Sequence, residues 1–314
     1  MGSRRVLVTG GAGFIGSALV RRLVADGSRV SVLIRPGGSM ERLEGIDGLQ
    51  VCAGDLRNAE AVAAAVKVSS PEMVYHLAST SFNQGQATAQ DHFETIAGGT
   101  LHLLEALKDR AGLRMVATGS AAEYGSGAGL REDQPLRPGT VLGAAKVAAF
   151  HLLQVSAQTA GLQPVTLRLF TPYGPGEHPR RLIPHVISCA LAGQDIPLTA
   201  GEQERDFVYL DDVVDALLMA ASPSVAGGSV FNIGSGQGTR VRDVVERVLG
   251  LMGHPVPARF GAVPTRTDEI MQMSADITAA QAQLGWSPRV PLEEGLRRSI
   301  AWFAQRRQMA EVGG

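Results

Sequence analysis

Short apolar runs alternate with longer segments of helical periodicity over the first half of the chain. The apolar runs predict six strands, at 6–9, 29–35, 49–53, 73–78, 114–118 and 164–170. Several are apolar almost throughout, which is typical of parallel strands that are covered on both faces. The helical segments fall between the strands, at 15–26, 59–66, 90–109 and 143–160. This alternation predicts an α/β fold with a Rossmann-type doubly wound parallel sheet.

The pattern is less regular after residue 171. Pro and Gly cluster at 172–179, and one further strand is predicted at 230–233. Further helices are predicted near 181–192, 211–221, 241–252, 275–284 and 292–305. We expect a smaller C-terminal substrate lobe beside the carboxyl ends of the strands, where such sheets bind ligands. The predicted nucleotide-binding domain is 1–170 and 206–238, and the predicted substrate-binding lobe is 171–205 and 239–314.

Composition and charge narrow the class of protein. With 314 residues, 45% of them apolar, the chain can bury a large core, yet no uncharged apolar run is long enough to cross a membrane. A formal net charge of −1 offers no basic field for nucleic acid or anionic lipid. The two cysteines, Cys52 and Cys189, fit a reducing compartment, and the N-terminus has no signal-peptide pattern. We therefore expect a cytoplasmic protein with a small-molecule substrate and without nucleic-acid or membrane partners.

A glycine-rich segment, Thr-Gly-Gly-Ala-Gly-Phe-Ile-Gly at 9–16, joins the first predicted strand to the first predicted helix. Gly10 permits a tight turn, Gly13 lets a pyrophosphate approach the backbone, and Gly16 lets helix and strand pack closely. The N–H groups at the start of the helix, near Phe14 and Ile15, favour phosphates. We predict that these five residues bind a dinucleotide cofactor; the alternative is a glycine turn without a ligand.

The end of the second predicted strand carries Arg35 where many dinucleotide sites have an acid that holds ribose hydroxyls. An Arg can pair with a 2′-phosphate, so NADP(H) is predicted over NAD(H), with Ser39 or Arg42 as possible helpers. The alternative is an Arg35 that is only solvated. Asp55 ends the third predicted strand and could accept a hydrogen bond from the adenine amino group, with Leu56 beside it.

An ordered series of motifs covers nearly the whole chain. It comprises TGGAGFIG (9–16), GDL (54–56), HLAS (76–79), GSAAEYG (119–125), RLFTPYGPGE (168–177), RDFVYLDD (205–212), FNIGSG (231–236) and LGWSPRVPLEEGL (284–296). This series resembles the extended short-chain dehydrogenase/reductase family of the NAD-dependent epimerase/dehydratase type. The resemblance is specific for the fold and less specific for the reaction.

The resemblance implies an acid–base Tyr four positions before a Lys. Lys146 matches the Lys, which in the family binds nicotinamide-ribose hydroxyls and lowers the pKa of the phenol, but the Tyr position holds Leu142. Ser120 matches a hydroxyl that in the family holds the substrate carbonyl oxygen. We therefore predict Ser120 and Lys146 as catalytic residues. The alternatives are an ordinary strand-end serine and a solvated helix lysine.

Further positions depart from the family pattern. Ala121 and Ala122 stand where dehydratases carry an Asp-Glu pair, and Ile96 and Thr171 each replace an Asn. Four residues are possible substitute acids: Glu123, Tyr124, Tyr173 and His178. Family members that have the usual Tyr also carry the Tyr-Gly pairs at 124–125 and 173–174, so the alternative for both tyrosines is a structural role. No His pair has metal-ligand spacing on a common helix face, so we assign no metal.

The missing phenol leads to a specific hypothesis. Loss of a general acid costs about 10²–10⁴-fold in rate, so a substrate that supplies its own proton, or a proton from water, is favoured. Leu142, Ile96 and the two alanines also predict an apolar site. This departure resembles atypical ketoreductases of the angucyclinone type, known from simocyclinone biosynthesis. The leading prediction is an NADPH-dependent ketoreductase acting on a polycyclic aromatic polyketide ketone in antibiotic biosynthesis.

Two alternatives stay open. The first is a nucleotide-diphosphate-sugar epimerase or 4-ketoreductase, in which Arg205 and Arg266 grip the diphosphate as in relatives. Those arginines could instead form structural ion pairs with neighbouring acids, namely Asp206, Asp268 or Glu269. The second alternative is a non-catalytic NADP(H)-binding sensor.

The helix predicted around 143–158 is apolar around most of its circumference. Covering only one face would leave apolar surface exposed, and family members pair this helix with its copy. We therefore predict a two-fold homodimer.

Overall fold

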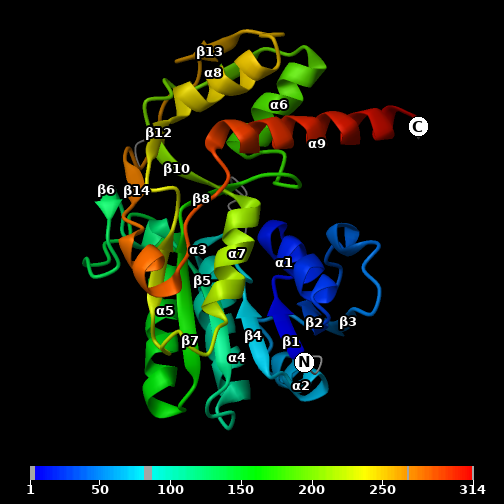
Figure 1. Cartoon of the computed structure of the whole chain (residues 1–314), viewed down its shortest axis with the longest axis vertical. Helices are drawn as coiled ribbons and strands as arrows, with labels where there is room; N and C mark the ends of the chain where they lie inside the picture. Colours follow the sequence, from blue (N-terminus) through cyan, green and yellow to red (C-terminus); the bar gives the residue numbers. More distant parts are fainter. Residues whose placement is uncertain (1–3, 81–86, 267–268, 313–314) are drawn as a thin grey trace.

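The computed structural model describes residues 4–80, 87–266 and 269–312. Its centre is a seven-stranded sheet in the order β11-β7-β5-β4-β1-β2-β3, in which every neighbouring pair is parallel (Figure 1). The strands are β1 (Arg5–Thr9), β2 (Arg29–Ile34), β3 (Gln50–Ala53), β4 (Met73–His76), β5 (Arg114–Ser120), β7 (Gln163–Leu169) and β11 (Val230–Ile233). The predicted doubly wound parallel sheet is confirmed.

The strand order places a ligand crevice at one point of the sheet. From β1 the chain adds β2 and β3 on one side, and it then crosses to β4, β5 and β7 on the other. The loops that leave β1 and β4 therefore diverge, and open sheets of this kind bind ligands at that switch point, beyond the carboxyl ends of the strands.

Helices cover both faces of the sheet, which explains the nearly continuous apolar strands. On one face α1 (Phe14–Ala25) and α7 (Leu210–Ala220) enclose a core that includes Leu19, Val32 and Val213. On the other face α2 (Ala59–Ser69), α4 (Gly99–Leu107) and α5 (Val141–Thr159) enclose a second core (Figure 1). The two cores hold the strand ends in fixed relative positions.

The helix predicted at 90–109 has an internal irregularity. It consists of α3 (Ala89–His92), the π-helical turn η2 (Phe93–Gly98) and α4. The π-helical turn packs against α5, where Ile96 joins a small apolar cluster with Ala145, Ala149 and Leu142. Such turns are rare and occur frequently near functional sites.

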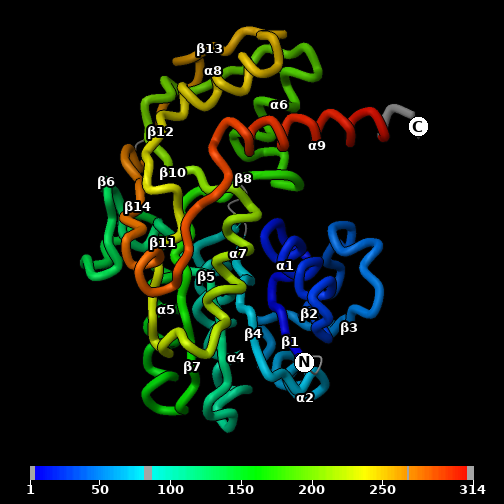
Figure 2. Tube along the Cα trace, in the orientation of Figure 1, coloured from blue at the N-terminus to red at the C-terminus, as the bar shows by residue number. Residues whose placement is uncertain are grey.

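The C-terminal lobe has its own core. It contains α6 (Leu182–Ala192), β9 (Ile196–Leu198), β10 (Glu204–Tyr209), α8 (Val241–Leu251), β13 (Ala258–Phe260) and α9 (Leu292–Val312), which gather above the sheet in Figures 1 and 2. β10 pairs in parallel with β8 (Thr171–Tyr173) and antiparallel with β12 (Gly238–Arg240). These strands join the lobe to the carboxyl edge of the sheet.

The segment predicted as a helix at 275–284 differs from expectation. It begins at the last residue of β14 (Met273–Ala275), which pairs with β6 (Gly127–Leu130), and it ends in a short π-helical turn, η4 (Ala280–Leu284). Ala280, Leu284 and Trp286 pack into the core beneath α1 and α7, although the predicted division assigns them to the lobe. Asp212 on α7 holds the segment after η4 in place, because its carboxylate accepts the N–H groups of Arg289 and Val290.

None of the helices within the described ranges combines the length and the apolar content that a membrane-spanning helix requires.

Candidate functional site

A cavity of about 750 Å³ lies beyond the carboxyl ends of β1, β2, β3 and β4. It occupies the switch point of the sheet. Its lining includes eight residues predicted to bind a cofactor: Gly10, Gly13, Phe14, Ile15, Gly16, Arg35, Asp55 and Leu56. Its volume lies in the range of sites for cofactors and small molecules, about 300–1,000 Å³.

The glycine loop after β1 has a conformation that other residues would obstruct. Gly10 has φ +72°, and a Cβ there would lie 2.6 Å from the backbone N of Ala78. A Cβ on Gly16 would lie 2.1 Å from the carbonyl oxygen of Gly10. Gly13 is the N-cap of α1 and has no side chain to satisfy the first-turn N–H groups. The start of α1 thus faces the cavity with open donors, which fits the phosphates of a dinucleotide.

Two residues after β2 line the same cavity. Arg35 is exposed there, and Ser39 lies four residues further along the loop. Arg42, named as a possible helper, points elsewhere, since its Nε and Nη2 donate to the carbonyl oxygen of Gly176 at 3.2 and 3.1 Å. Arg42 therefore connects the loop to the lobe.

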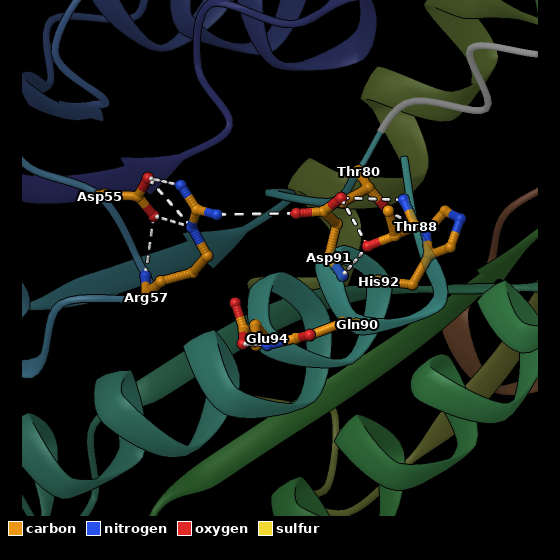
Figure 3. Close-up of polar contacts among 8 residues, drawn as sticks. All are labelled: Asp55, Arg57, Thr80, Thr88, Gln90, Asp91, His92 and Glu94. Carbon is orange, nitrogen blue, oxygen red and sulfur yellow. Dashed lines mark hydrogen bonds and ion pairs between the residues drawn. The ribbon is translucent and has the colours of Figure 1, made fainter. Parts of the chain in front are cut away.

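An ion-pair chain spans one edge of the cavity (Figure 3). Arg57 donates through its backbone N, Nε and Nη2 to the carboxylate of Asp55, with the shortest side-chain contact at 2.8 Å. Its Nη1 faces Asp91 Oδ1 at 3.8 Å, and both Arg57 and Asp91 line the cavity. These hydrogen bonds from Arg57 hold the pKa of Asp55 below its usual value. Arg57 and Asp91 were not among the predicted site residues, and the Asp-Leu-Arg spacing at 55–57 is the one local signal for the Arg57 contact.

Lys146 and Ser120 lie beside the cavity rather than in its lining. Lys146 is buried on α5 and its Nζ donates to the carbonyl oxygen of Thr118, a lining residue, at 2.7 Å. Burial lowers the pKa of Lys146 to about 8, against an opposing effect of the charge on Glu123. Ser120 ends the same strand, two residues beyond Thr118, and its Oγ accepts the N–H of Ala122 at 3.2 Å.

A buried ionic network holds the backbone of Ser120 in place. Glu123, in the short turn η3 (Ala121–Glu123), accepts the Ser120 N–H on Oε1 and the Arg168 Nε–H on Oε2, both at 2.7 Å. Arg168 Nη1 donates to the Tyr124 hydroxyl at 2.9 Å, and that hydroxyl donates to Asn232 Oδ1 at 2.7 Å. The side chains of Glu123 and Arg168 are only 0% and 1% exposed. Glu123 and Arg168 are 45 positions apart, so no local sequence pattern predicts this pairing.

The proposed substitute acids have structural partners. Glu123 and Tyr124 belong to the network around Arg168, and burial raises the pKa of Tyr124 to about 12. Tyr173 is buried and donates to the carbonyl oxygen of Leu292 at 3.1 Å, and burial raises its pKa. His178 is more open and accepts the N–H of Arg180 through Nδ1 at 3.2 Å.

Arg205 and Arg266 are brought together by one acid. Arg205 Nη2 forms a close ion pair with Glu269 Oε1, and Arg266 Nη2 lies 3.1 Å from Glu269 Oε2. Asp206 does not serve as their partner. It is buried and accepts the backbone N–H groups of Ser235, Gly236 and Ala275. Asp268 lies outside the described residues.

Three or more His, Cys, Asp or Glu side chains do not gather as metal ligands anywhere in residues 4–80, 87–266 and 269–312.

Comparison with known proteins supplies the class of relatives. A family model described as the NAD dependent epimerase/dehydratase family matches residues 6–234. The chain is 31% identical to a UDP-glucose 4-epimerase of Mycolicibacterium smegmatis, over 97% of this chain and 100% of that protein. The structure of a UDP-glucose 4-epimerase with UDP-glucose from Thermotoga maritima matches with a TM-score of 0.88 and 29% identity, covering 96% of this chain and 99% of that chain. MoeE5 in complex with UDP-glucuronic acid and NAD matches with a TM-score of 0.85 and 33% identity, covering 96% and 99%.

The predicted polyketide ketoreductase is therefore wrong. The relatives are nucleotide-sugar epimerases and dehydratases, as the first alternative expected. The error came from reading Leu142 and its apolar neighbours as a ligand surface. Of these residues Ile96 and Ala121 are 2% and 0% exposed, so their side chains serve packing, and Leu142 and Ala122 are only partly exposed.

Proposed function

Because the chain belongs to the NAD-dependent epimerase/dehydratase family, we propose that it is an enzyme that transfers hydride at a carbon of a nucleotide-diphosphate sugar. The relatives that carry a bound UDP-sugar resemble this chain over nearly its whole length, lobe included, which supports the same class of substrate. The reaction is then an epimerisation or a reduction of a 4-keto sugar.

The observation that carries this proposal is the pair of arginines on Glu269. The guanidinium groups of Arg205 and Arg266 both lie on the carboxylate of Glu269, which brings two cationic side chains together in the lobe. A pyrophosphate offers oxygens that suit guanidinium groups in bidentate geometry. We propose that Arg266, which is about half exposed, turns toward the diphosphate while Arg205 stays on Glu269.

We further propose that NADP(H) is the preferred cofactor. Relatives bind NAD, and a nicotinamide dinucleotide fits the glycine loop and the cavity. Arg35 and Ser39 follow β2 in the cavity lining and suit a 2′-phosphate, whereas an acid there would repel one. Replacing Arg35 by Ala should narrow the gap between the dissociation constants of NADPH and NADH. Equal constants in the unaltered protein would contradict this preference.

The chain's own residues suggest how a proton moves. When bound, the nicotinamide ring supplies or accepts the hydride. Leu142 cannot exchange a proton, and we propose that Lys146 does so. Its Nζ lies 2.7 Å from the carbonyl oxygen of Thr118, which lines the cavity, and burial lowers its pKa to about 8, near the pH at which a general acid or base works best. We propose that the Ser120 hydroxyl holds the sugar oxygen, since Glu123 fixes the Ser120 backbone from behind.

Calorimetric titration with UDP-glucose, dTDP-glucose and free UMP tests the substrate class. Replacing Arg266 by Gln should weaken nucleotide-sugar binding about tenfold or more, because a charge-assisted hydrogen bond is lost. Arg259→Gln is the matched control: Arg259 is also an exposed lobe arginine in an ion pair, with Asp195 at 3.2 Å. It should leave binding unchanged. Failure of the unaltered protein to bind any nucleotide sugar would contradict the proposal.

A further inference from the structure

Arg57 is the central residue of the ion-pair chain at the edge of the cavity (Figure 3). Asp55 follows β3 and Asp91 lies in the first turn of α3, so Arg57 spans two separate elements of the cavity wall. Asp91 is itself fixed, since its Oδ2 accepts the backbone N–H and the hydroxyl of Thr88, both at 2.8 Å. Its Oδ1 is the oxygen that faces Arg57.

The two contacts of Arg57 differ in strength. Three N–H donors of Arg57 bind the Asp55 carboxylate at 2.8–3.2 Å, in the bidentate geometry of the strong Arg–carboxylate pairs. The contact with Asp91 is 3.8 Å long between side chains that are 45% and 37% exposed, and such pairs contribute little. Arg57 therefore acts mainly on Asp55, and Asp91 only biases the guanidinium toward this position.

This arrangement fixes the chemistry that Asp55 presents to the cavity. An ionised carboxylate has about four lone-pair positions, and the three Arg57 donors use three of them. One acceptor position is left for a ligand. Because the carboxylate is charged and held in one orientation, that position accepts a donor and repels an acceptor.

We propose that Arg57 is a positioning residue that makes the cofactor pocket selective for a purine with an exocyclic amino group. This inference rests on the proposed cofactor site, with the base lying against Asp55. Adenine presents an N–H₂ donor at its position 6, and hypoxanthine presents a carbonyl acceptor there. By holding the Asp55 carboxylate in one orientation, Arg57 favours the binding of adenine and disfavours the binding of hypoxanthine.

Dissociation constants for NADPH and for its hypoxanthine analogue, nicotinamide hypoxanthine dinucleotide phosphate, test the inference. Both are measured in reduced form from the change in protein fluorescence. The unaltered protein should bind NADPH about ten- to a hundredfold more tightly than the analogue, as expected when a hydrogen bond to a charged group is lost. Arg57→Gln should reduce this ratio to less than about threefold, and Arg57→Lys should give an intermediate ratio because Lys is charged but not bidentate. Asp91→Asn should change the ratio by less than about threefold.

Arg131→Gln is the matched control. Arg131 forms the same contact across two residues, with Nε and Nη2 on the carboxylate of Asp133 at 3.1 and 2.9 Å, but it does not line the cavity. Its ratio should equal that of the unaltered protein.

Three results would overturn the inference. If Arg57→Gln leaves the ratio of the dissociation constants of the hypoxanthine analogue and NADPH unchanged, the orientation of the Asp55 carboxylate does not depend on Arg57. The dissociation constant of NADH is measured as well for Arg57→Gln. If this variant loses the preference for NADPH over NADH but keeps the preference for NADPH over the hypoxanthine analogue, Arg57 contacts the 2′-phosphate instead. Absence of dinucleotide binding by the unaltered protein would overturn the cofactor site itself, and the inference with it.

Discussion

The buried pair of Glu123 and Arg168 should be essential for stability. Glu123→Gln keeps the shape of the side chain but leaves one acceptor oxygen for two donors, the Ser120 N–H and the Arg168 Nε–H. The new amide N–H₂ then faces one of these donors, and the Arg168 charge loses its counter-ion at 1% exposure. Breaking a buried pair in this way costs about 3–5 kcal/mol, a large part of the roughly 5–15 kcal/mol that stabilises a folded protein.

Urea unfolding followed by tryptophan fluorescence measures this loss. Glu293→Gln is the matched control, because Glu293 also contacts an arginine, Arg297, at 2.7 Å, but with side chains 64% and 56% exposed. The control should change the free energy of unfolding by less than about 0.5 kcal/mol. The two ion pairs thus have the same shortest distance, and they differ in burial and in the second donor of Glu123, the Ser120 N–H. Similar losses in the two variants, or a Glu123→Gln loss below about 1 kcal/mol, would refute the reasoning.

The remaining predictions concern acid stability, mechanism and assembly. Burial lowers the pKa of His76 to about 3, so below about pH 6.5 the unfolded chain binds a proton that the folded chain does not. The free energy of unfolding should therefore fall as the pH drops from about 6.5 toward 3, by up to about 1.4 kcal/mol per pH unit. In urea titrations His76→Gln should make this dependence on pH less steep. An unchanged dependence on pH in the variant would contradict a role for His76. Tyr124→Phe should lower turnover by far less than the 10²–10⁴-fold of a lost general acid, and a larger loss with cofactor binding intact would make that phenol catalytic. Light scattering at micromolar concentration should give the mass of a homodimer, since α4 and α5 expose Leu101 and Val155; a monomeric mass would contradict this.

Local sequence signals predicted the fold well. The glycine loop lies between the end of β1 and the start of α1, and the short apolar runs became strands in the expected parallel sheet. These features depend on residues that are close in sequence, so periodicity and turn chemistry suffice to find them. The predicted cofactor residues from 10 to 56 line one cavity because parallel strands all end at the same edge of the sheet.

Features that depend on distant residues were missed or misread. The Glu123–Arg168 pair joins the end of β5 to β7, and no local pattern marks it. Residues 280–284 have helical periodicity, but their packing beneath α7 is set by the contact of Trp286 with Asp212. Leu142 stands where the family resemblance implies an acid–base Tyr, and one changed residue does not identify a substrate. Reading it as a substrate signal produced the wrong function.

Single-turnover absorbance at 340 nm, with protein and bound cofactor in excess, tests the central claim most directly. With NADPH bound, adding a nucleotide 4-keto sugar should lower the absorbance; with NADP⁺ bound, adding UDP-glucose or dTDP-glucose should raise it. Either change shows hydride transfer between the cofactor and a nucleotide sugar. A constant absorbance with every nucleotide sugar, while cofactor binding is demonstrated, would contradict the claim and favour a non-catalytic dinucleotide-binding sensor.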